Sequence, residues 1–75
     1  MSAEVPAEQD QQEIERLVRR AVGTTKTEEL LGTAVSWYDF FNALTAAANR
    51  ATRESVARQL QLEGGRVLDR FLEAA

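Results

Sequence analysis

Few residues of this chain could carry out catalysis, and their surroundings do not favour it. The sequence contains no histidine and no cysteine, so the usual neutral-pH general base and the thiol nucleophile are both missing. Zinc sites built from cysteine and histidine are excluded for the same reason. The serines are Ser2, Ser36 and Ser55, and none lies in a Gly-x-Ser-x-Gly nucleophile motif. We therefore expect a protein that is not an enzyme and that needs no metal or cofactor.

Arginine is the other residue type here with specific chemistry. Eight of the nine basic residues are arginines, whose planar guanidinium groups suit carboxylates and phosphates. The densest run is NRATR, with Arg50 and Arg53 as possible anion contacts. Residues 1–13 carry four acids and no base, so removing −4 from the net charge of −3 leaves +1 for residues 14–75. A dedicated nucleic-acid-binding domain is normally far more basic. DNA binding through the Arg50/Arg53 region is therefore the alternative function rather than the leading one.

The stretch SWYDFF contains four of the five aromatic residues. On a helix, Trp37 and Phe41 project one way with Phe40 beside them, whereas Tyr38 points about 100° round the axis. One narrow core stripe cannot bury all four rings. We expect Trp37, Phe40 and Phe41 to lie in a core and Tyr38 to contact a partner.

The chain reads as an all-α protein, a small bundle of three to four helices behind a flexible acidic tail over residues 1–9. After this tail we expect a single helical domain over residues 10–75. Asp10 and Glu13 resemble a capping box for a helix over 10–22, which Gly23 ends. Thr27 can cap a short element over 28–35, and Ser36 with Asp39 gives a second start signal.

The segment from Trp37 to Leu62 contains no glycine or proline and is rich in alanine. We expect one long helix over 37–62. The apolar stripe fails after Ala51, however, so a break near RATRES with Thr52 as a new cap is the alternative. Gly64 and Gly65 are expected to end the long helix, and a terminal helix over 66–74 follows.

Two sets of apolar residues emerge from these helices. The expected core comprises Leu17, Val18, Trp37, Phe40, Phe41, Leu44, Leu68 and Phe71. A second set has no obvious partner within the chain and is expected to bind one; it comprises Leu30, Leu31, Tyr38, Val56 and Leu60. Aromatic residues are enriched at interface hot spots, which favours this interpretation.

Seventy-five residues form one domain whose core rarely supplies more than about 3–5 kcal/mol. Burial against a partner is a common way to support such a core, and disulfides are impossible here. We therefore expect a non-catalytic adaptor, docking, assembly or inhibitor protein that binds another protein and forms an antiparallel homodimer. The composition and the acidic start, with no long apolar run, indicate a bacterial-type cytoplasmic protein that does not bind membranes.

Overall fold

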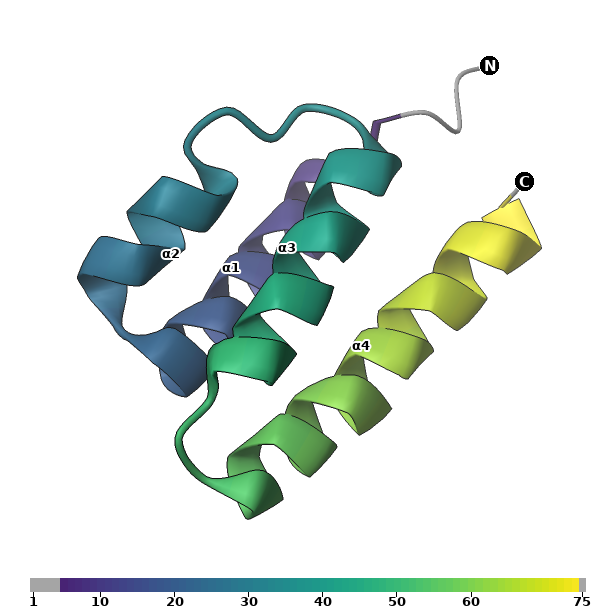
Figure 1. Cartoon of the computed structure of the whole chain (residues 1–75). Helices are drawn as coiled ribbons and strands as arrows, with labels where there is room; N and C mark the ends of the chain where they lie inside the picture. Colours follow the sequence, from purple (N-terminus) through teal and green to yellow (C-terminus); the bar gives the residue numbers. More distant parts are fainter. Residues whose placement is uncertain (1–4, 75) are drawn as a thin grey trace.

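The computed structural model describes residues 5–74, which form four α-helices and no β-strand. The helices are α1 (Glu8–Val22), α2 (Thr24–Leu31), α3 (Trp37–Arg50) and α4 (Glu54–Ala74). They run alternately up and down, with α1, α3 and α4 packed on one another and α2 lying against α1 and α3 (Figure 1). The predicted small all-α bundle is thus confirmed. The tail predicted over 1–9 lies partly outside the described residues, and its last two residues belong to α1.

The predicted capping box at the start of α1 is wrong. The helix begins at Glu8, its N-cap is Ala7, and no side chain forms a cap hydrogen bond. The carboxylates of Asp10 and Glu13 point instead to the guanidinium of Arg70 on α4, which lies 3.6 Å from the Asp10 Oδ1 atom. The Asp10 and Glu13 carboxylates, which the sequence pattern predicted to cap α1, therefore form ion pairs with α4 instead.

Gly23 ends α1 as predicted, with a φ of 87° in the left-handed region that favours glycine. The next helix starts at once, at Thr24, so the element expected over 28–35 begins four residues earlier and has the same length of 8 residues. Thr27 is not its cap. The Thr27 side chain is buried, and its hydroxyl donates a hydrogen bond of 2.7 Å to the Gly23 carbonyl oxygen.

The capping box predicted for Ser36 and Asp39 is confirmed at the start of α3. The backbone N–H of Asp39 donates to the Ser36 hydroxyl oxygen at 3.2 Å. In return, the Asp39 carboxylate accepts hydrogen bonds from the backbone N–H groups of Val35 at 3.0 Å and of Ser36 at 3.2 Å. These bonds hold the pKa of Asp39 below its usual range because they stabilise the charged carboxylate, and the bond from Val35 has the largest effect. They also fix the helical turn that carries the aromatic cluster.

The helix expected over 37–62 does not exist; the alternative, a break near RATRES, is the observed arrangement. Helix α3 stops at Arg50, and Ala51 adopts an extended conformation with a ψ of 131°. A straight helix of that length would be about 39 Å long and would carry Leu60 away from the core. Reversing the chain at residues 51–53 turns Leu60 back onto α1 and α3, where it is buried.

Gly64 and Gly65 do not end a helix either, because α4 continues through both to Ala74. Glycine costs roughly 1 kcal/mol relative to alanine inside a helix. Packing outweighs this cost, since the continued helix places Val67 and Phe71 on the same inward side as Leu60. Gly64 is itself buried and adds to the packing: a Cβ atom placed on it would lie 3.5 Å from the Leu44 Cδ1 atom. This is an ordinary van der Waals distance, so α4 packs closely on α3 at a position that would also accommodate alanine.

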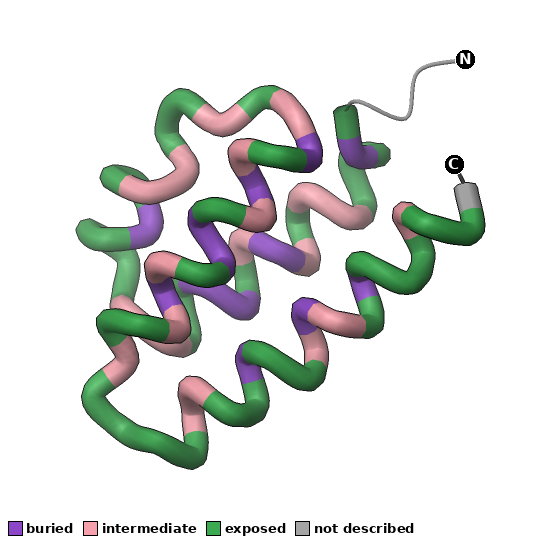
Figure 2. Tube along the Cα trace, turned by 45° about the vertical axis from the view of Figure 1, so that its right-hand side comes forward, coloured by how far each residue is buried: buried purple, intermediate pink, exposed green. Residues whose placement is uncertain are grey.

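The core lies between α1, α3 and α4, whose inward sides carry the buried positions (Figure 2). Its fully buried large side chains are Ile14, Val18 and Val67. Trp37 closes one end of this core by stacking on Phe41, with ring centroids 5.1 Å apart. The core thus joins the three longer helices, and α2 covers one side of the α1–α3 pair.

Candidate functional site

The predicted core residues are mostly where the sequence placed them. Leu17, Val18, Trp37, Phe40 and Leu44 are buried. Phe41 and Phe71 are half-buried and pack against this cluster, with their ring centroids 6.0 Å apart.

The predicted set of partner-binding residues changes substantially. Leu60 is only 3% exposed and belongs to the core, because the chain reversal before α4 turns it inward. Leu30 and Leu31 are half-buried against the core, since α2 folds over α1 and α3. Val56 is also half-buried, beside Leu60 in a small hollow against α1. Of the five predicted residues only Tyr38, at 74% exposed, presents its side chain to solvent.

Tyr38 lies on the side of α3 that faces solvent next to α4. Helical spacing places Phe41, Thr45 and Asn49 along the same side, at i+3, i+7 and i+11 from Tyr38. Phe41, Thr45 and Asn49 of this row line one wall of a surface groove, and Tyr38 precedes them by one helical turn.

The opposite wall comes from α4, where the sequence analysis expected two separate helices with a break at Gly64 and Gly65. Gln61, Gly65 and Leu68 lie along it at helical spacing, and Leu72 continues the row one turn further. Leu68 was predicted to be in the core, but it is 38% exposed. The error follows from the helix break assumed at Gly64, because a separate terminal helix could have turned Leu68 inward.

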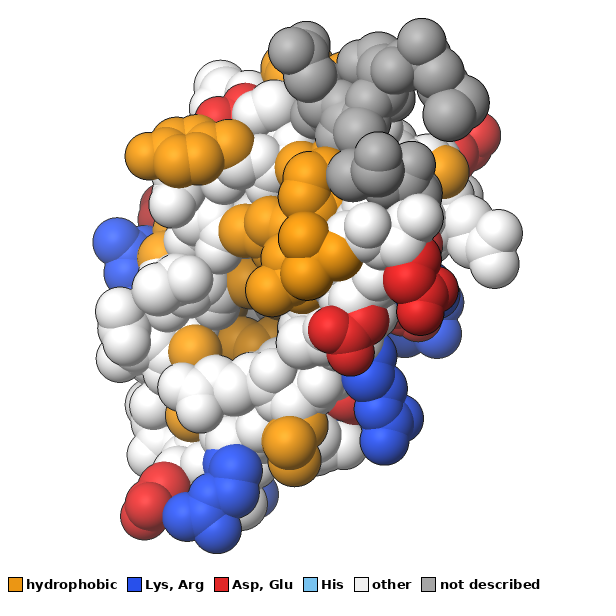
Figure 3. Space-filling view, turned by 90° about the vertical axis from the view of Figure 1, so that its right-hand side faces the viewer, with side chains coloured by type: hydrophobic (Ala, Val, Ile, Leu, Met, Phe, Trp, Pro, Cys, Tyr) orange, Lys and Arg blue, Asp and Glu red, His pale blue; other side chains and the backbone are white. Residues whose placement is uncertain are grey.

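Together these rows enclose a hollow of about 390 Å³, which we name the α3/α4 groove. Its lining residues are Phe41, Leu44, Thr45, Ala48, Asn49, Leu60, Gln61, Gly64, Gly65 and Leu68. None of them is charged. Seen from the α4 side, apolar side chains gather in a strip down this face, with charged side chains beside it (Figure 3). The groove is therefore an uncharged surface in a chain whose net charge is −3.

Small residues give the α3/α4 groove its shape. Ala48 on α3 and Gly64 and Gly65 on α4 leave space where larger residues would fill it. At Gly65 a Cβ atom would meet no other atom within 4 Å, so packing within the chain does not require glycine there. The sequence signal that could have identified this surface is the pair of glycines, once they are read as part of a helix.

The two predicted anion contacts lie away from the α3/α4 groove's apolar strip. Arg50 is in the last turn of α3, Arg53 is in the connection to α4, and both are exposed. Within residues 5–74 neither forms an ion pair.

No group of three or more acidic residues in the described part of the chain is arranged to hold a metal ion. Across residues 5–74, no helix has the length and apolar content needed to cross a membrane. Comparison of the chain with protein-family models, with curated proteins and with solved structures gave no match.

Proposed function

We propose that this chain is a small non-catalytic protein-interaction module that binds an α-helix in the α3/α4 groove. The observation that carries the proposal is the uncharged groove itself. By helical spacing, the exposed residues Tyr38 and Leu72 lie one turn beyond its lining on α3 and α4. Contiguous exposed apolar surface on a small domain is typical of an interaction site. The other four residues predicted to bind a partner are buried or half-buried within the chain; they are Leu30, Leu31, Val56 and Leu60.

The shape of the groove favours a helix as the ligand. Amphipathic helices bind in grooves between two helices, with anchor residues at i, i+3, i+4 and i+7. Gly65 retains a helix cost of roughly 1 kcal/mol that internal packing does not explain. A partner helix crossing at Gly65 would explain it, because the missing Cβ atom lets two backbones lie close together.

A second copy of the same chain is the occupant we propose. The surface carries both a projecting part, formed by Tyr38, Leu68 and Leu72, and a recessed part at Ala48 and Gly65. Two copies related by a two-fold axis can place each projecting part against the other's recess. An uncharged surface also lets two acidic chains meet without bringing like charges together.

A non-catalytic role accords with the side chains available. Ser36 uses its hydroxyl to cap α3, and the Asp39 carboxylate is committed to the same cap. The sequence supplies no histidine as a neutral-pH base and no cysteine as a thiol nucleophile. Binding rather than bond chemistry is the function that these residues support.

The test is the molecular mass in solution, measured by light scattering on a sizing column over a wide range of protein concentration. We expect a dimer that Leu72→Ala dissociates. Leu62→Ala is the matched control, because Leu62 is 67% exposed against 60% for Leu72, on the same helix but outside the groove's row. A monomer at all concentrations would contradict self-association.

A monomer would leave the α3/α4 groove to a different protein, and the sequence's alternative could then be tested directly. Duplex DNA binding that weakens steeply with salt and is lost in Arg50→Gln/Arg53→Gln would support nucleic-acid binding instead. Such a result would reject the proposed module.

A further inference from the structure

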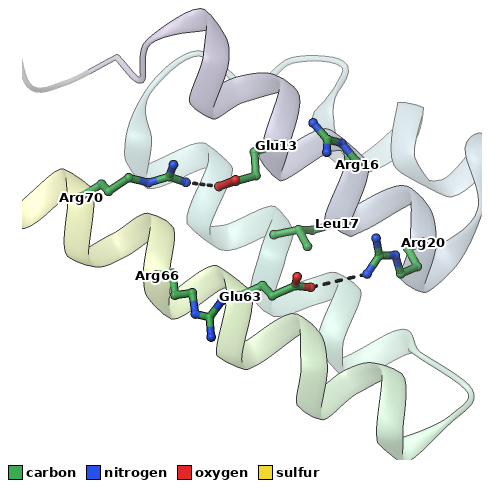
Figure 4. A pocket seen from close by; sticks show the side chains of 7 residues that line it. All are labelled: Glu13, Arg16, Leu17, Arg20, Glu63, Arg66 and Arg70. Atoms are coloured by element: carbon green, nitrogen blue, oxygen red, sulfur yellow. Dashed lines mark hydrogen bonds and ion pairs between the residues drawn. The ribbon is translucent and has the colours of Figure 1, made fainter.

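The face between α1 and α4 carries a second hollow, of about 320 Å³, which is independent of the α3/α4 groove (Figure 4). Four arginines line it, and we name them the α1/α4 arginine cluster: Arg16, Arg20, Arg66 and Arg70. Glu13 and Glu63 are the acidic residues of the lining, and Leu17 lies between the two helices. The lining residues carry four positive and two negative charges, or +2, and the Asp10 carboxylate beside Arg70 reduces this locally to +1, whereas the whole chain carries −3.

Two of the four arginines form ion pairs across the hollow. Arg20 lies 3.6 Å from Glu63, and Arg70 pairs with Glu13. Each carboxylate of the hollow thus has one arginine within ion-pair distance, and the buried Glu63 Oε2 atom accepts no hydrogen bond from residues 5–74. Arg16 and Arg66 form no ion pair with any described residue.

The register of the helices places these two arginines opposite each other. The pairs Arg20–Glu63 and Glu13–Arg70 show that α1 and α4 are antiparallel and that position 16 lies across from positions 66 and 67. Arg16 and Arg66 thus occupy the middle of the face, with one ion pair on each side of them. Their side chains extend away from each other (Figure 4), as expected of like charges with nothing between them.

We propose that the α1/α4 arginine cluster binds a phosphate group between Arg16 and Arg66. Guanidinium groups bind phosphate oxygens through paired, charge-assisted hydrogen bonds, and two such groups match a doubly charged anion. The volume is at the lower end of the roughly 300–1,000 Å³ of small-ligand sites, so the ligand is compact.

The experiment is a titration of the isotope-labelled protein with pyrophosphate at fixed pH and ionic strength, followed by amide chemical shifts. We expect saturable shifts concentrated in residues 13–20 and 63–70. Arg16→Gln/Arg66→Gln should weaken binding at least tenfold. The matched control is Arg19→Gln/Arg58→Gln, because these arginines lie on the same two helices but pair with Glu15 and Glu54. Equal weakening in both variants, or shifts spread over the whole surface, would overturn the proposal.

A second measurement separates binding from a structural role. Without ligand, Arg16→Gln/Arg66→Gln should raise the Tm, because it removes two like charges that line the same hollow and have no acidic partner in the described part of the chain. Pyrophosphate should raise the Tm of the unmodified protein but not of this variant, because a ligand stabilises only a protein that binds it. A lower Tm in the variant without ligand would show that the arginines serve the fold and would contradict the proposal.

The same titration with a phosphoserine peptide identifies the source of the phosphate group. Tighter binding of the peptide than of pyrophosphate would indicate a phosphorylated protein partner, and the reverse order would indicate a free small molecule. Either order supports the site. Since the arginine pair lies outside the α3/α4 groove, Arg16→Gln/Arg66→Gln should leave the oligomeric state unchanged, so the two proposals fail separately.

Discussion

Trp37 in the first turn of α3 and Phe71 near the end of α4 lie with ring centroids 5.0 Å apart and ring planes inclined by 48°. This contact joins two residues that are far apart in the sequence and closes one end of the core. It also fixes the start of α3 against the end of α4, the two helices whose residues line the α3/α4 groove.

Replacing Phe71 with alanine should lower the free energy of unfolding by about 2 kcal/mol. Fully buried phenylalanines lose about 3–5 kcal/mol, and Phe71 is only half-buried. Urea denaturation followed by the fluorescence of Trp37, the only tryptophan, measures the change. Leu72→Ala, at an exposed neighbouring position, should change the stability of the monomer by no more than about 0.5 kcal/mol. Equal losses in both variants would show that the aromatic contact has no special role.

Leu60→Ala should lower the stability of the fold, whereas Tyr38→Ala should weaken the dimer and leave the fold stable. Leu60 is buried, so its truncation should cost about 2–5 kcal/mol of unfolding free energy. Tyr38→Ala should leave monomer stability within about 0.5 kcal/mol of the original and weaken the dimer. Denaturation at a concentration where the chain is monomeric, together with light scattering, separates the two effects. A Leu60→Ala variant that is as stable as the original chain but does not associate would show that Leu60 lies in the dimer interface, as the sequence predicted.

Gly65→Ala should stabilise the monomer by about 0.5–1 kcal/mol and weaken helix binding in the groove. The added methyl group meets no atom within 4 Å, and alanine is the better helix former. Gly32→Ala is the contrasting variant, because its Cβ atom would lie 2.6 Å from the Glu28 carbonyl oxygen and should destabilise the fold. If Gly65→Ala left association unchanged, close backbone approach at this position would be disproved.

The Asp39 cap should make stability depend on pH in acid. The pKa of Asp39 is lowered in the folded chain by hydrogen bonds from Val35 and Ser36. Its contribution is therefore complete above the unfolded-state pKa of about 4 and is lost as pH falls through the lower folded-state value. Thermal unfolding of the original chain and of Asp39→Asn should converge below about pH 4 and differ near neutrality. A constant difference between them at every pH would contradict this account.

Local chemistry in the sequence determined the helical class, the end of α1 at Gly23 and the start of α3 at Ser36. Each depends on residues within four positions of one another, such as the reciprocal hydrogen bonds between Ser36 and Asp39. The same holds for the directions of Trp37 and Phe40 relative to Tyr38, because helical spacing alone separates them. The exposure of Tyr38 was decided by how the other helices pack on α3.

Tertiary structure decided where the alanine-rich segment turns and what Gly64 and Gly65 do. Local propensity favours a helix that continues through Thr52 and ends at the two glycines. Burying Leu60 and Val67 in one core requires a chain reversal near Thr52 and a helix that continues through the glycines. Packing energy between helices exceeds a helix cost of roughly 1 kcal/mol at a glycine. Both candidate sites depend on that decision. Only a continuous α4, antiparallel to α1 and α3, brings Leu68 beside Phe41 and places Arg66 opposite Arg16.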